Sequence, residues 1–218
     1  MKKKHLRALS SLENWLSEQN IINEELKSSL ELIRKVIENY AEKNSIEGGK
    51  LPPPAEIMGD SLAVALYTDG GCRGNPGPGA YAFVVQDEKG EVLAEGVEFE
   101  SHTTNNKMEL SGPIRGLQEI KDVLASVGKD SLLTKVKVMT DSKYVVDGMK
   151  SWVKTWKARG WKKADNKTPE NIELWQQLDL LKNSFFDIEW IWVKGHGGHP
   201  QNEYCDKRAN ETMDENLS

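Results

Sequence analysis

Apolar residues recur at helical spacing through residues 1–43. The first run consists of Leu6, Leu9, Leu12 and Leu16, and the second of Ile22, Leu26, Leu30, Ile33, Ile37 and Tyr40. Ser10 and Glu13 have the spacing of a capping box, and Asn23 is a second possible helix start. We therefore expect two helices, with a hairpin as one arrangement.

Residues 44–60 interrupt this pattern with Gly48-Gly49 and the triplet Pro52-Pro53-Pro54. Such composition is typical of a linker that is partly flexible and partly extended. We expect three parts: a helical extension of residues 1–43, a linker of residues 44–60, and a domain of residues 61–218.

From residue 61 onward, short apolar runs alternate with helical spacing. Strands are predicted at residues 62–67, 80–86, 92–100, 134–140 and 187–193, the first ending at Asp69. Helices are predicted at 106–127, as short pieces over 142–157, at 168–181 with Pro169 in its first turn, and from near Pro200. The order βββαβαβα predicts an α/β domain with a mixed sheet and helices packed against it.

The composition suits a globular protein, with 38% hydrophobic and 29% charged residues among 218. No apolar run approaches the roughly 20 residues that cross a bilayer, and no apolar core follows Met1-Lys2-Lys3-Lys4, so we expect no membrane contact and no secretory signal. Two cysteines, Cys72 and Cys205, favour a reducing, cytoplasmic compartment.

The charge distribution changes the meaning of the net charge of −5. Residues 150–167 hold seven basic residues and one acid, which gives +6 and leaves −11 for the rest of the chain. Phosphates respond to a local basic patch, so this segment indicates a nucleic-acid partner despite the acidic total.

Four acids stand out by their surroundings: Asp69, Glu109, Asp141 and Asp206. Asp69 and Asp141 each follow a predicted strand, where ligands of α/β sheets gather. A single acid in such a place usually caps a turn, but four beside glycines and asparagines favour a shared site. If they converge, they form a carboxylate cage for paired divalent cations that act on a phosphodiester.

His196 lies among Gly195, Gly197 and Gly198, which permit loop movement. Two alternatives remain open for it. It is either an ordinary surface histidine, or a zinc ligand together with His199 and Cys205, although no fourth soft ligand is evident.

Several motifs together resemble type 1 ribonuclease H of the bacterial kind. They are Thr68-Asp69-Gly70, the stretch from Gly74 to Gly79, the stretch from Thr104 to Leu110, Thr140-Asp141-Ser142, and the stretch from Trp192 to His196 continuing to Asp206. The resemblance covers about residues 62–213. It implies a ribonuclease H-like fold with a mixed five-stranded sheet and endonucleolytic cleavage of the RNA strand of RNA·DNA hybrids. It also implies two Mg²⁺ ions, with Mn²⁺ as an alternative, and 5′-phosphate and 3′-hydroxyl ends.

The resemblance also assigns roles. Asp69 would bridge both metals, Asp206 would complete the ion that activates water, and Glu109 and Asp141 would hold the ion facing the leaving oxygen. His196 would be the histidine of a flexible loop that helps proton transfer or product release.

The same resemblance implies two sets of substrate contacts. The basic segment would be a protruding handle that grips the hybrid through Trp152, Trp156, Lys157, Arg159, Trp161, Lys162 and Lys163. Asn75, Asn105 and Asn106 would read the 2′-hydroxyls of the RNA, and Asn75, Thr104 and Asn171 would hold a DNA phosphate. Tryptophans at this spacing usually pack, so we expect buried rings and outward lysines.

Three positions depart from expectation. His102 stands where relatives often have arginine, and Lys143 stands where they often have glutamine. Both differences change the charge near the expected phosphate contacts, so the sequence does not fix the affinity for phosphate. Pro113, four residues after Glu109, predicts a kink in an unbroken helix.

Residues 1–60 have nine basic and ten acidic residues, which does not suggest nucleic-acid binding. Their helices would pack on the domain, on a second copy or on another protein; we expect a monomer. Two other functions remain possible on the same fold: a non-catalytic hybrid-binding protein and a DNA-acting nuclease.

Overall fold

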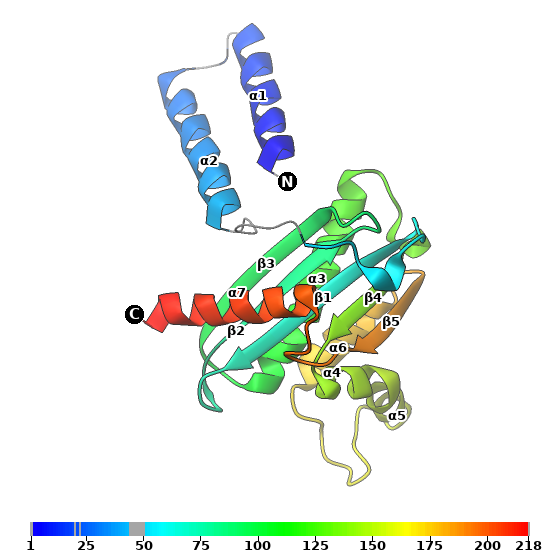
Figure 1. The fold of residues 1–218 in the computed structure, drawn as a ribbon. Helices are drawn as coiled ribbons and strands as arrows, with labels where there is room; N and C mark the ends of the chain where they lie inside the picture. The colour runs from blue at the N-terminus through cyan, green and yellow to red at the C-terminus, as the bar shows by residue number, and fades with distance from the viewer. Residues whose placement is uncertain (1, 20, 22, 44–50, 218) are drawn as a thin grey trace. The chain divides into compact units, whose positions relative to one another are not determined.

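The computed structural model describes residues 2–19, 21, 23–43 and 51–217. Contacts group the chain into two compact units, Met1–Lys50 and Leu51–Ser218 (Figure 1). Within the described residues, no helix is both long and apolar enough to cross a membrane.

The first unit is the predicted pair of helices, α1 (Lys2–Glu18) and α2 (Glu24–Lys43), which pack side by side as a hairpin. Leu9 and Leu30 are buried, and Arg34 forms an ion pair of 2.5 Å with Glu13. The Asn23 side chain accepts a hydrogen bond from the Leu26 amide at 2.8 Å, which confirms it as a helix cap. The predicted capping box at Ser10 is wrong, because Ser10 lies inside α1; Ile22 lies outside the described residues.

The linker expected at residues 44–60 differs from the structure in its second half. Residues 44–50 lie outside the described part of the chain, whereas residues 51–60 belong to the second unit. This segment, here called the strap, contains the 3₁₀ helix η1 (Ala55–Ile57) and buries Leu51 and Ile57. Apolar burial on both sides of the proline triplet explains why the strap packs instead of swinging free.

The second unit contains the predicted mixed sheet of five strands, in the order β3-β2-β1-β4-β5. The strands are β1 (Ala63–Cys72), β2 (Gly77–Gln86), β3 (Val92–Thr103), β4 (Lys135–Thr140) and β5 (Asp187–Trp192). β1 pairs with β2 antiparallel and with β4 parallel, and β4 pairs with β5 parallel. β3 is antiparallel to β2 at one edge.

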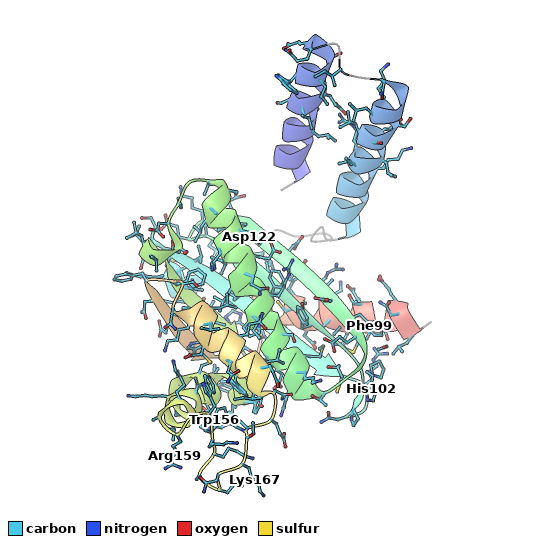
Figure 2. The ribbon with its side chains drawn as sticks, turned by 180° about the vertical axis from the view of Figure 1, so that it is seen from behind. Phe99, His102, Asp122, Trp156, Arg159 and Lys167 are labelled. Carbon is cyan, nitrogen blue, oxygen red and sulfur yellow. The ribbon has the colours of Figure 1, made fainter. Side chains whose placement is uncertain are left out.

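Helices cover both faces of this sheet. α3 (Asn105–Ser126) packs on β1 and β2 on one face, with α6 (Ile172–Lys182) against it, and α7 (Pro200–Leu217) packs on β1, β2 and β3. Figure 1 shows α7 in front of the sheet, and Figure 2 shows the opposite side with α3 in front. The first six residues of β1 are therefore all buried, as expected for a strand covered on both faces.

α3 continues through Pro113 as predicted, and the bend expected there stays a prediction. One turn of this helix lies very close to β1, since an added Cβ at Gly112 would be 2.0 Å from the Thr68 hydroxyl. The glycine next to the proline thus has a packing reason to be there.

The segment after β4 is helical in three successive pieces: α4 (Lys143–Asp147), a π-helical turn η3 (Gly148–Trp152) and α5 (Val153–Ala158). The helix predicted at 168–181 begins later than expected. Its cap is Asn171, in the left-handed region at φ 54°, so Pro169 lies before α6.

Candidate active site

Two of the four acids come from neighbouring parallel strands. The register of β1 with β4 pairs Tyr67 with Met139, and Asp69 and Asp141 each follow two residues later. β1 does not end at Asp69 as predicted, because its pairing with β2 continues to Cys72. Adjacent parallel strands therefore deliver both carboxylates to one edge of the sheet.

The other two acids come from helices on the two faces of the sheet. Glu109 lies in α3 and Asp206 in α7, both within the helices that the sequence predicted. Burial raises the pKa of Asp69 to about 8, and the negative charges of Asp141, Asp206 and Glu109 contribute to this rise. Burial likewise raises the pKa of Glu109. The four predicted carboxylates thus share one electrostatic environment.

Neutral donors hold three of these acids. The Gly70 amide donates to Asp69 Oδ1 at 2.7 Å. Asn105 Nδ2 donates to Glu109 Oε1 and Ser142 Oγ to Glu109 Oε2, both at 2.8 Å. These bonds orient the carboxylates without neutralising their charge.

Asp206 is held within its own helix, where Asn210 Nδ2 donates to its Oδ1 at 2.8 Å. Neither Asn210 nor Ser142 was predicted as a site residue, although Ser142 belongs to the motif Thr140-Asp141-Ser142. Helical i,i+4 spacing could have revealed Asn210, because residues four apart are neighbours on a helix surface.

The donor set suits a hard divalent cation, because carboxylate oxygens are the ligands that Mg²⁺ prefers. Burial raises the pKa of Asp69, and repulsion from the other three acids adds to the rise, which a bound cation would relieve. No group of three or more His, Cys, Asp or Glu side chains in the described part of the chain is already spaced to hold a metal.

His196 lies in the loop between β5 and α7. Its side chain is 81% exposed, and Nδ1 is 3.8 Å from Asp206 Oδ2. Its φ of 50° and the φ of 83° at Gly198 place both in the left-handed region. The zinc alternative gains no support among the described residues, because His199 contacts Glu56 and the buried Cys205 thiol faces the Tyr67 carbonyl.

The polar residues predicted to read RNA lie around the start of α3. Thr104 caps this helix and accepts from the Lys107 amide at 3.4 Å, and Asn105 and Asn106 occupy its first turn. Exposed Asn75, from the turn between β1 and β2, accepts from the Asn105 amide at 3.4 Å. These four predicted contacts therefore form one polar surface that adjoins Glu109.

The segment of residues 150–167 is here called the handle. It contains α5 and the protruding loop that follows it (Figure 2, where Trp156, Arg159 and Lys167 are labelled). Its tryptophans are partly buried against the core, as predicted: the rings of Trp152 and Trp156 are 6.0 Å apart, and Trp161 packs there too. Trp156 also meets the buried Trp175 ring at 5.7 Å. Packed rings thus fix a base from which the cationic side chains extend.

The cations of the handle are not equivalent. Arg159 and Lys162 are exposed and Lys163 is half-buried, and Lys162 Nζ donates to the Thr168 hydroxyl at 2.9 Å. Lys157 instead forms an ion pair of 2.6 Å with Asp179, which is only 8% exposed. The contact of Lys157 with a phosphate stays a prediction.

An open groove of about 410 Å³ lies at the base of the handle. It is lined by Tyr144, Trp152, Trp156, Lys163, Pro169 and Glu170. Asn171 lies beside it, and its amide donates to the Tyr144 hydroxyl at 3.4 Å. The groove thus combines three aromatic rings with one cation, Lys163, and one acid, Glu170.

His102 and Lys143, two of the three positions that depart from expectation, lie on the surface. His102 is exposed at the end of β3, and Lys143 Nζ lies 5.0 Å from the centre of the Trp192 ring. The indole of Trp192 in turn donates to the Asp141 carbonyl at 2.9 Å. Lys143 thus brings a cation close to one edge of the carboxylate site.

Comparisons with known proteins agree with this geometry. Residues 61–214 match the family model of RNase H. The chain is 46% identical over 156 residues to a ribonuclease H of Treponema denticola, covering 69% of this chain and 96% of that protein. It is 44% identical over 147 residues to one of Tolumonas auensis, covering 67% and 86%.

Solved structures give the same result. One is the N-terminal RNase H domain of a Mycobacterium tuberculosis protein, 34% identical with a TM-score of 0.53, covering 71% of this chain and 95% of that one. Another is LC11-RNase H1 in complex with an RNA/DNA hybrid, 29% identical with a TM-score of 0.55, covering 71% and 99%. A third, LC9-RNase H1, is described as a type 1 RNase H; it is 34% identical with a TM-score of 0.58, covering 71% and 73%. The chain therefore belongs to the ribonuclease H family of nucleases, in its type 1 form.

Proposed function

We propose that this protein hydrolyses the RNA strand of RNA·DNA hybrids with two divalent cations, leaving 5′-phosphate and 3′-hydroxyl ends. The observation that carries this proposal is that Asp69, Glu109, Asp141 and Asp206 share one electrostatic environment: burial raises the pKa of Asp69 to about 8, and the charges of the other three acids contribute to this rise. Family membership and the similarity to a structure solved with an RNA/DNA hybrid support the substrate class.

The proposed division of work is the one that the resemblance to type 1 ribonuclease H implies. Asp69, on which the charges of the three other acids act, would be the shared ligand. Asp206, near His196, would serve the cation on the side of the attacking water, and Glu109 with Asp141 the cation on the side of the leaving oxygen. Bound Mg²⁺, or Mn²⁺, supplies Lewis-acid charge at both oxygens during in-line displacement.

The remaining residues would select and hold the substrate. Asn75, Asn105 and Asn106 carry amides that both donate to and accept from a 2′-hydroxyl, which DNA lacks. Thr104 and Asn75 would hold a phosphate of the DNA strand. Asn171, whose amide donates to the Tyr144 hydroxyl, would hold the same phosphate with them.

His196 is proposed to move protons or release product. Its exposed ring, flanked by glycines and 3.8 Å from Asp206, can approach and leave the reacting water without disturbing the sheet. Free cysteines at Cys72 and Cys205 accord with the proposed cytoplasmic setting.

The test is a hybrid labelled on each strand, incubated with Mg²⁺ beside duplex DNA, with the Asp141→Asn variant as the matched control. We expect cleavage of the RNA strand alone, loss of cleavage in the variant, and 3′ ends that a polymerase extends. An uncleaved RNA strand would refute the proposal. Equal cutting of duplex DNA would favour a DNA-acting nuclease instead, and binding without cleavage a hybrid-binding protein.

A further inference from the structure

The strap contacts the start of α7 through two polar links, one to Gln201 in its first turn and one to His199 just before it. In the first, Gln201 Nε2 donates to the Pro52 carbonyl at 2.8 Å and to Gln86 Oε1 at 3.0 Å. Both glutamines are at most 2% exposed. Buried amides that find partners on both sides fix the strap against the start of this helix.

The second link centres on Glu56 of the strap. Its Oε2 accepts from the Tyr67 hydroxyl at 2.8 Å, and its Oε1 lies 2.9 Å from His199 Nε2. The Tyr67 and His199 rings pack at 5.1 Å. The Glu56 carboxylate thus links Tyr67 and His199, and the two rings pack beside it at a tilt of 47°, which leaves His199 little freedom to move.

His199 is the last residue of the loop that carries His196. The loop rejoins α7 through two further bonds, from the Gly198 amide to Glu203 Oε1 at 2.8 Å and from the Glu203 amide to the His199 carbonyl at 3.0 Å. Upstream of His199 the loop is rich in glycine and therefore conformationally permissive. The position of His196 over Asp206 thus depends on where this downstream end is fixed.

We propose that Glu56 is a positioning residue that acts through His199 to fix the His196 loop and the entry of α7, the helix that carries Asp206. This inference rests on the proposed roles of His196 and Asp206. The strap precedes residue 61, where the match to the RNase H family begins. The chain therefore supplies this anchor from a segment outside the matched domain.

The experiment compares Glu56→Ala and Glu56→Gln with Asp60→Asn in the full-length protein. Glutamine retains a hydrogen bond to each partner, whereas alanine loses both. Asp60 is the matched control, because it lies in the same strap and makes one ion pair of 2.9 Å, to Lys135 at the start of β4. The readouts are kcat and KM on a hybrid with Mg²⁺, and amide exchange of residues 195–203 without substrate or metal.

For Glu56→Ala we expect kcat to fall roughly tenfold, with KM within about twofold of the wild type. Misplacing a reacting group lowers the rate of the chemical step, not the affinity for the substrate. Amide exchange should accelerate at Gly198 and Glu203. Glu56→Gln should restore kcat to within about threefold of the wild type, because both hydrogen bonds survive at neutral strength. Asp60→Asn should change neither readout.

Two results would overturn the inference. One is a Glu56→Ala enzyme whose kcat equals that of Asp60→Asn; the other is faster exchange confined to residues 51–60. A wild type that leaves the RNA strand intact would instead refute the proposed function, and the exchange measurement would still decide whether Glu56 fixes the loop.

Discussion

The carboxylate site and the handle hold opposite charges in opposite ways. The acids are partly buried, and Asp69, Glu109 and Asp206 each accept a short hydrogen bond from a neutral donor. In the handle the tryptophan rings are packed, while cations such as Arg159 extend into solvent. Hydrogen bonds therefore fix the carboxylates in the active site, whereas in the handle packing fixes the tryptophan rings and leaves Arg159 exposed.

This difference matches two physical requirements. In-line displacement depends on the positions of reacting atoms, so a small displacement of a carboxylate is costly. Attraction to a phosphate backbone depends mainly on the number of nearby cations and the salt concentration. We therefore infer that the carboxylates set the rate of chemistry and the handle sets the affinity for the hybrid.

The largest effect is expected from Asp69→Asn. Loss of the shared carboxylate should lower single-turnover cleavage by at least ~10³-fold, because cation-assisted attack requires that anion. The dissociation constant for the hybrid, measured by fluorescence anisotropy, should stay within about threefold, since phosphate contacts dominate affinity. Exposed Asp122 on α3 (Figure 2) provides the control, because Asp122→Asn removes an equal charge far from the site. A collapse of hybrid binding in Asp69→Asn would contradict the separation of roles.

The next effect concerns geometry alone. An added Cβ at Gly195 would lie 2.4 Å from Asp141 Oδ2, so Gly195→Ala must displace that carboxylate while leaving its charge. We expect kcat to fall by about 10- to 100-fold with a nearly unchanged KM.

Gly71→Ala is the matched control for this substitution, because its Cβ would meet Asn105 Oδ1 at an ordinary 3.5 Å. Steady-state kinetics of both variants decide the point. Equal kcat values would show that the carboxylate site tolerates displacement.

For the handle we expect an effect on binding. Arg159→Ala combined with Lys163→Ala should weaken hybrid binding about tenfold at physiological salt and reduce the salt slope by about 2. Lys129→Ala, an exposed lysine outside the handle, is the control. A salt titration of binding measures both quantities, and an unchanged slope would remove these two cations from the interface.

The smallest effect is expected on how the thermal stability of the metal-free protein depends on pH. The pKa of about 8 for folded Asp69 lies above the value of about 3.9 for an unfolded aspartate. The folded state therefore binds the proton more tightly, and its stability falls as pH rises from about 4 to about 8. Asp69→Asn removes this loss, so its Tm should exceed that of the wild type by a few degrees at pH 8 and approach it near pH 4. Thermal melts in chelator provide the measurement; a lower Tm at pH 8 would contradict the raised pKa.

The sequence predicted the sheet, the helices and the four acids because each depends on local information. Strand periodicity, a glycine-rich turn and an acid next to them are all readable within a few residues. The packing of the handle tryptophans was likewise predicted from their spacing, whereas the substrate contacts of Asn105 and Thr104 were implied by the family resemblance and stay predictions.

What the sequence did not predict depends on contacts between distant residues. The strap looked like a linker because its prolines and glycines gave no sign of partners at Tyr67 and His199. The ion pair of Lys157 was not predicted because Asp179, its partner, is 22 residues away. The late start of α6 at Asn171 depends on a left-handed residue that no local pattern requires.

The most direct test is single-turnover cleavage of a labelled hybrid at increasing enzyme concentration, with Asp69→Asn and the Arg159→Ala, Lys163→Ala double variant measured side by side. We expect the handle variant to reach the wild-type rate at saturating enzyme, and Asp69→Asn to stay near background at every concentration. A handle variant whose saturated rate is as low as that of Asp69→Asn would contradict the claim that the carboxylates set the rate of chemistry and the handle sets the affinity for the hybrid.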